Sequence, residues 1–148
     1  MTMKFMMIIK ANKDSEAGVM PSEKLLLEMG KYNEQLVKSG VLLAADGLQA
    51  SSKGARVNFA NGKVTAVDGP FAESKELIAG YWIIQVKSKA EAVEWARRVP
   101  LDPNAPDGNQ IEVRQLFEAA DFAPELSGSA EGRALMEAEG RFRKNSKS

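Results

Sequence analysis

Residues 81–99 read YWIIQVKSKAEAVEWARRV and contain the clearest strand of the chain, followed by its clearest helix start. The first part, residues 81–86, is rich in aromatic and β-branched side chains, which favour a pleated and half-buried strand. Ser88 is a residue type that caps helices, and Glu91, three positions later, completes a capping box. The helix that follows extends from Lys89 to about Arg98. This stretch therefore predicts a strand joined directly to a helix.

The order strand, helix, strand occurs twice along the chain. It appears first as residues 5–9, 21–39 and 41–48, and again as residues 81–86, 89–99 and 111–117. Two such units, interleaved in one antiparallel sheet with both helices on one face, form the ferredoxin-like split βαβ arrangement, which is an α+β fold. A doubly wound sheet is the alternative, but the sequence offers only two helices to cover its two faces. We therefore expect the ferredoxin-like arrangement.

Asn61 and Gly62 predict a β-hairpin inserted between the two units. Asn-Gly is the strongest short hairpin signal, since both residues tolerate the positive φ that a type I′ turn requires. This turn sets the register of the flanking strands, which then have one apolar and one partly polar face. The expected cross-strand pairs are Phe59–Val64, Asn58–Thr65, Val57–Ala66 and Arg56–Val67.

The composition excludes several classes of function. The chain has 148 residues, 44% of them apolar and 27% charged, which is typical of a globular protein with one main domain. Twenty basic residues balance twenty acidic ones, so the basic excess of a nucleic-acid-binding protein is absent. The sequence has neither cysteine nor histidine, which excludes disulfides, thiolate or imidazole metal sites and every histidine base. Acid–base chemistry would fall to Asp, Glu, Lys or Tyr, and we expect no metal and no cofactor.

Two further features bear on location and on domain organisation. The apolar run at residues 5–9 is too short for a signal peptide core or a membrane span, so we expect a cytoplasmic protein without a membrane partner.

Near the C-terminus, Ser127-Gly128-Ser129 indicates a flexible joint, and residues 130–143 fit a helix. We expect a domain at residues 1–120 and a C-terminal extension with one helix at residues 121–148.

The expected fold has a consequence for assembly. Two helices on one face of the sheet leave the other face uncovered, while residues 81–84 place bulky groups on both faces of their strand. A large exposed apolar face is unusual on a soluble monomer. We therefore expect a homodimer in which the two uncovered sheet faces pack against each other.

The segment between the hairpin and the strand at residue 81 reads VDGPFAESKELIAG, residues 67–80. Asp-Gly-Pro favours a turn, since Asp68 can bond the backbone ahead of it and Pro70 fixes φ. Glu73 and Lys75 then add charged groups within one short turn. One interpretation is a rigid connector anchored by Phe71. The other is a site in which Asp68, partly desolvated near Phe71, acts as a general acid or base.

The run DGPFAESKE at residues 68–76, followed by Gly80 and Tyr81, closely resembles the signature of the DGPF-type branch of the YCII-related family. The segments GLQAS, EAVEWARRVP and IEVRQL fit the same family, and the resemblance covers residues 3 to about 118. It implies a ferredoxin-like domain that pairs into a dimeric α+β barrel. It also implies an association with extracytoplasmic-function sigma factors. YCII relatives with proposed catalysis use a His–Asp pair, and this chain has no histidine.

The resemblance leaves Asp68, Glu73 and Lys75 as candidate catalytic residues. On the last expected strand, Glu112 and Arg114 point to the same face, where they could form a bidentate pair or hold the carboxylate of a ligand. Tyr81 is a third candidate for ligand binding, as part of the lining of an apolar pocket.

Two hypotheses of function follow. The first is a metal-free enzyme or small-molecule-binding protein that uses carboxylate acid–base chemistry, with Lys75 or Arg114 stabilising negative charge. The second is a non-catalytic dimeric interaction or regulatory module, linked to sigma-factor signalling. An enclosed cavity lined by Asp68, Glu73 and Arg114 would favour the first, and a filled apolar interior with those groups in solvent would favour the second.

Overall fold

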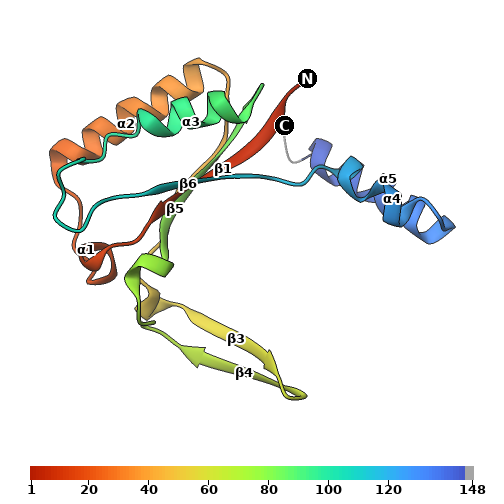
Figure 1. The fold of residues 1–148 in the computed structure, drawn as a ribbon, viewed down its shortest axis with the longest axis horizontal. Coiled ribbons are helices and arrows are strands. Elements are labelled where there is room, and N and C mark those ends of the chain that lie inside the picture. Colours follow the sequence, from red (N-terminus) through yellow and green to blue (C-terminus); the bar gives the residue numbers. More distant parts are fainter. Residues whose placement is uncertain (146–148) are drawn as a thin grey trace. The chain divides into compact units, whose positions relative to one another are not determined.

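The computed structural model describes residues 1–145, which fall into two compact units. The first unit is Met1–Gln115 and the second begins at Leu116. The first contains a four-stranded antiparallel sheet and a separate two-stranded hairpin, with two longer helices, α2 (Glu23–Lys38) and α3 (Lys89–Arg97) (Figure 1). The α+β class expected from the sequence is confirmed.

Four strands form the main sheet in the order β2-β5-β1-β6, with every neighbouring pair antiparallel. They are β1 (Met3–Lys10), β2 (Leu42–Gly47), β5 (Ile78–Val86) and β6 (Ile111–Gln115). The helix α2 (Glu23–Lys38) connects β1 to β2, and α3 (Lys89–Arg97) connects β5 to β6. Each strand–helix–strand unit thus encloses a strand of the other unit. The sheet of the single chain is open, with β2 and β6 at its edges.

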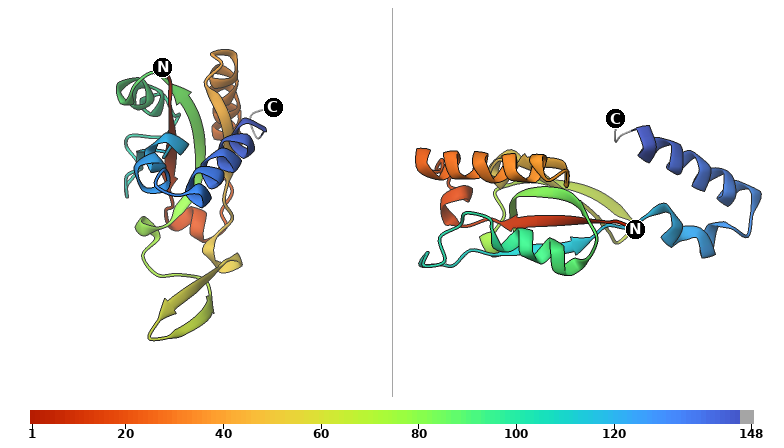
Figure 2. Two further views of the ribbon diagram at one scale, coloured as in Figure 1. Left: turned by 90° about the vertical axis from the view of Figure 1, so that its right-hand side faces the viewer. Right: turned by 90° about the horizontal axis from the view of Figure 1, so that it is seen from above.

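Both longer helices lie on the same side of the sheet, as the views in Figure 1 and Figure 2 agree. Side chains alternate along a strand, and those of β5 alternate between partly exposed and buried from Tyr81 to Val86. The buried side chains from the sheet and from both helices form one core: Phe5, Met7, Tyr32, Leu36, Val41, Trp82, Ile84, Val86, Ala92, Trp95 and Val99. Inside it, the Tyr32 hydroxyl donates a hydrogen bond of 2.7 Å to the Trp95 carbonyl oxygen.

The helix ends follow the local chemistry expected from the sequence. Ser22 Oγ accepts a hydrogen bond from the Leu25 N–H at 3.1 Å, and Ser88 Oγ accepts one from the Glu91 N–H at 3.1 Å. The Glu91 carboxylate, expected to bond the Ser88 N–H, instead accepts from the N–H of Lys87 at 2.9 Å. Both helices therefore begin at a serine that satisfies an otherwise free backbone donor.

The hairpin of β3 (Ala55–Ala60) and β4 (Lys63–Asp68) has the predicted register throughout. Asn61 and Gly62 adopt the positive φ values, 53° and 72°, that the two-residue turn requires. The two strands form a sheet of their own, separate from the main one, and every residue in them is exposed. A lone hairpin is at best marginally stable in water, so its base needs other contacts.

The second unit contains η3 (Ala119–Phe122), α4 (Ala123–Leu126) and α5 (Ala130–Asn145), the last on the segment expected to be helical. The expected last strand, residues 111–117, is too long, because β6 ends at Gln115 opposite Phe5. Phe117 belongs to the second unit, where its ring lies 5.0 Å from that of Phe122. Among the described residues, no helix is long and apolar enough to cross a membrane.

Leu36→Ala should destabilise the fold strongly, because the Leu36 side chain is 0% exposed in the core. The loss of buried area and the cavity left behind together cost about 2–5 kcal/mol. Leu26→Ala on the same helix is the control, since Leu26 is 49% exposed, and it should cost about 0.5 kcal/mol or less. Urea denaturation measures both, and equal losses for the two variants would contradict this assignment of the core.

Candidate functional site

The sheet face that the helices do not cover is called the open face below. Two of its cross-strand rows contain the predicted ligand-binding residues. Strand register aligns Asp46, Tyr81, Ile8 and Glu112 in one row, and Ala44, Ile83, Met6 and Arg114 in the next. The three residues that the sequence predicted to bind a ligand, Tyr81, Glu112 and Arg114, therefore share this face. Ile8, Met6 and Ile83 lie in the middle of these rows, and three of the four row ends carry a charge: Asp46, Glu112 and Arg114.

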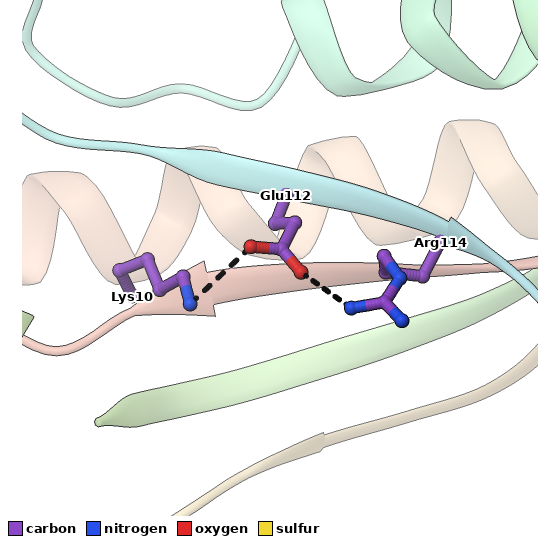
Figure 3. A network of polar contacts seen from close by, with 3 residues as sticks. All are labelled: Lys10, Glu112 and Arg114. Atoms are coloured by element: carbon purple, nitrogen blue, oxygen red, sulfur yellow. Dashed lines mark hydrogen bonds and ion pairs between the residues drawn. The ribbon is translucent and has the colours of Figure 1, made fainter. Parts of the chain in front are cut away.

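Lys10, Glu112 and Arg114 form a connected group of charges on the open face (Figure 3). Arg114 Nη1 lies 3.2 Å from Glu112 Oε2, and Lys10 Nζ lies 3.4 Å from the other carboxylate oxygen, Oε1. The predicted pair of Glu112 and Arg114 is present, but it is not bidentate. Arg114 contacts one carboxylate oxygen of Glu112 through a single nitrogen, and Lys10 contacts the other oxygen. The hydrogen bond from Arg114 and the charge of Lys10 lower the pKa of Glu112 below its usual value.

Tyr81 is held on the open face by a neighbouring strand. Its hydroxyl donates a hydrogen bond of 3.1 Å to Asp46 Oδ2. This bond, together with the negative charge of Asp46 and partial burial, raises the pKa of Tyr81. Tyr81 therefore stays protonated near neutral pH and serves there as a hydrogen-bond donor rather than as a base.

A hollow of about 420 Å³ lies at the end of β1. Three segments that are distant in the sequence line it: residues 10–13, Ser74 and Lys75, and residues 107–110. Its charged side chains are those of Lys10, Lys13, Lys75 and Asp107. Of the three candidate catalytic residues, Lys75 is the one that reaches this hollow. The first and third segments were missed, because they carry ordinary loop residues whose meeting depends on the tertiary fold.

The other two candidate catalytic residues lie outside the lining of the hollow. Asp68 is the last residue of β4, pairs with Ala55 across the hairpin, and is exposed. Glu73 is exposed as well and has a left-handed backbone, with φ of 57°, directly before the short helix η2 (Ser74–Glu76). Neither carboxylate thus has the desolvated surroundings that would favour proton transfer near neutrality.

A hydrogen-bonded group, called the Ser51 clasp below, fixes the DGPF segment and consists of Glu16, Ser51 and Phe71. Glu16, in α1 (Lys13–Glu16), accepts hydrogen bonds from the Ser51 N–H and Oγ–H. Ser51, the first residue of η1 (Ser51–Lys53), uses its Oγ to accept the Phe71 N–H at 3.0 Å. The clasp joins α1, η1 and the base of the hairpin.

Two further contacts pack the same turn closely. A Cβ atom on Gly69 would lie 1.8 Å from the Ser51 carbonyl oxygen, so no other residue fits there without moving the backbone. The Arg56 guanidinium lies 4.0 Å from the centre of the Phe71 ring, in a cation–π contact. Packing in this turn thus accounts for the presence of Gly69 and Phe71 without a catalytic role.

Comparison with known proteins agrees with this architecture. The profile of the YCII-related domain matches residues 3–120. The chain belongs to the YCII-related family. The YCII-related domain includes the whole sheet, the Ser51 clasp and the lining of the hollow. The chain is also 30% identical, over 94 residues, to the uncharacterised protein R00369 of Rhizobium meliloti (strain 1021), a match that covers 64% of this chain and 74% of that protein.

Ser51→Ala should destabilise the YCII-related domain by about 1–3 kcal/mol, because it removes a donor to the Glu16 carboxylate and the acceptor of the Phe71 N–H. Ser52→Ala is the matched control, since Ser52 is the exposed neighbour in the same short helix, and it should change the free energy of unfolding by about 0.5 kcal/mol or less. Urea denaturation provides the measurement. A Ser51→Ala protein as stable as the wild type would show that the clasp does not hold.

The carboxyl group of Glu112 should titrate below the usual pH for glutamate in an NMR titration, and Arg114→Gln should raise its pKa. Because the folded-state pKa is lowered, the charged group stabilises the fold above the pKa of unfolded glutamate. That contribution is lost as the pH falls through the lowered value. Lys63→Gln, which removes a positive charge from the exposed hairpin, is the control and should leave the pKa of Glu112 where it is. A Glu112 pKa that Arg114→Gln does not change would contradict the ion pair.

Proposed function

We propose that this YCII-related protein binds a small molecule in the hollow at the end of β1. The observation that carries the proposal is the hollow itself. Its volume of about 420 Å³ lies within the range of roughly 300–1,000 Å³ that is typical of small-molecule sites. Side chains of differing charge converge on it from three segments, and Lys75 comes from the run that resembles the DGPF-type signature.

Binding has more support than acid–base catalysis by Asp68 and Glu73. Both carboxylates are exposed and lie outside the lining of the hollow, whereas Lys75 and Asp107 are part of it. In this proposal the DGPF-type run acts through its shape: the Ser51 clasp fixes the turn, and the turn leads into η2, which carries Ser74 and Lys75 to the hollow.

Ser74→Trp tests the site, because an indole in place of the hydroxyl would occupy the hollow without changing its charge. A thermal-shift screen of small carboxylic acids, phosphates, phenols and nucleotides should find compounds that raise the Tm of the wild type. A ligand at 100 times its Kd stabilises a protein by about 2.7 kcal/mol. Ser74→Trp should lose this shift, and Ser52→Trp, at an exposed serine outside the lining, should keep it.

Two results would contradict the proposal. The first is a screen in which no compound raises the Tm of the wild type. The second is a set of ligands that bind Ser74→Trp as well as they bind the wild type, since their site would then lie elsewhere.

We further propose that the chain is a ferredoxin-like domain that forms a homodimer through its open face, as a dimeric α+β barrel does. The strand order β2-β5-β1-β6 with two interleaved units supports the first part. Met6, Ile8 and Ile83, which lie in the middle of the open face and are partly exposed, support the second. Burying two such faces against each other would remove this apolar surface from water.

Ile83→Glu should separate the dimer, because it would place a charge in the middle of the proposed interface. Size-exclusion chromatography with light scattering should give the mass of two chains for the wild type at micromolar concentration, and of one chain for the variant. Thr65→Glu, in the exposed hairpin, should remain dimeric. A monomeric wild type, or a folded Ile83→Glu protein that is still a dimer, would rule out this interface.

The alternative is the non-catalytic interaction or regulatory module, with the sigma-factor link that the family resemblance implies. The filled core and the exposed apolar side chains of the hairpin favour it, since Phe59 is 78% exposed and Val64 is 64% exposed. Under this alternative, no small molecule would lose its binding in the Ser74→Trp variant. A partner protein would bind the wild type, and Phe59→Ser would weaken that binding.

A further inference from the structure

The hollow is positively charged, whereas the whole chain has a formal net charge of zero. Three lysines and one aspartate line it, a surplus of two positive charges. Within residues 1–145, Lys13 and Lys75 have no carboxylate within ion-pair distance. Two ammonium groups of the hollow are therefore available to a ligand.

Most of the other residues that line the hollow have polar or small side chains. Amide groups come from Asn12, Asn109 and Gln110, a hydroxyl comes from Ser74, and Ala11 provides the one apolar side chain. A compact ligand with two negative charges would match the surplus, because an ammonium group binds carboxylate and phosphate oxygens as a point charge.

Lys10 is the third lysine, and it connects the hollow with the open face. Its side chain is 21% exposed, and its Nζ lies 3.4 Å from Glu112 Oε1. Glu112 has a second partner, Arg114 Nη1 at 3.2 Å from Oε2. If Lys10 turns toward a ligand, Glu112 keeps its pairing with Arg114. The exchange therefore gives up one long ion pair and leaves no charge without a partner.

We infer that the hollow is selective for small dianions that carry carboxylate or phosphate groups, and that Lys10 moves from Glu112 to the ligand when the ligand binds. The inference rests on the proposed function and names the ligand class of the same site. Glu112 is then a positioning residue that weakens anion binding by competing for Lys10. The affinity for a dianion therefore depends on the lysines of the hollow and also on Glu112 on the open face.

NMR titration of the ¹⁵N-labelled full chain at constant ionic strength tests the inference. The probes are succinate, inorganic phosphate and the neutral analogue succinamide. Succinate or phosphate should shift the amide signals of residues 10–13, 74–75 and 107–110, and succinamide should bind at least about tenfold more weakly. Succinate carries its two charges on separate carboxylates, and phosphate carries them on one group. The Kd values of the two probes show which arrangement the hollow prefers.

Variants separate the charges from the shape of the hollow. Lys75→Gln and Lys13→Gln should each raise the Kd of the dianion about tenfold, whereas Lys63→Gln on the hairpin should leave it unchanged. Glu112→Gln should lower the Kd about threefold, because Lys10 is no longer held at the open face. Glu34→Gln on α2 removes the same charge elsewhere and should have no such effect.

The outcomes distinguish the inference from the proposed function. Equal affinity for succinate and succinamide, or Kd values that do not respond to Lys13→Gln and Lys75→Gln, would overturn the inference while binding in the hollow stands. An unchanged Kd in Glu112→Gln would overturn the part played by Lys10. The proposed function itself fails if no probe shifts the amide signals of the hollow and no screened compound loses its effect on the Tm in the Ser74→Trp variant.

Discussion

The alternation of side chains along β1 and β5 is the constraint on which the rest of this structure depends. Adjacent residues point to opposite faces of a sheet, so Met7 and Ile84 enter the core under the helices while Met6 and Ile83 lie on the open face. A slip of one residue between the strands would place polar and apolar groups on the wrong faces. The core and the open face both follow from this register, which holds from Met3 to Ile9 of β1.

The Ser51 clasp gives a physical account of a conspicuous sequence motif. Gly69 is required because the Ser51 carbonyl oxygen occupies the space of a side chain, and Phe71 is held through its backbone N–H and its ring. The motif thus builds a rigid turn at the base of an exposed hairpin. Lys75 lies further along the same run, where the chain reaches the hollow, and there we propose that it contacts the ligand.

Features set by local chemistry could be predicted from the sequence. The hairpin register followed from Asn61 and Gly62, and the serine caps followed from their spacing to the helices. Glu112 and Arg114 share a face because they are two residues apart in one strand. The α+β class followed from the repeated order of strand and helix.

Features that depend on distant segments could not be read from the sequence. Lys10 meets Glu112 only because β1 and β6 are neighbours, and Glu16 meets Ser51 across a separation of 35 residues. The hollow requires three distant segments to converge, and two of them, residues 10–13 and 107–110, have no pattern that marks them in the sequence. The last strand was expected to continue to residue 117, but β6 ends at Gln115, and Leu116 and Phe117 belong to the second unit.

Oxidation of the neighbouring residues Met6 and Met7 by hydrogen peroxide, followed residue by residue with mass spectrometry, tests the division between the two faces most directly. Met7 is 0% exposed and should react slowly at every protein concentration. Met6 should react readily in dilute solution and become protected as the concentration rises and open faces pair. Equal rates for the two methionines would contradict the register, and a Met6 rate independent of concentration would contradict the pairing of the open faces.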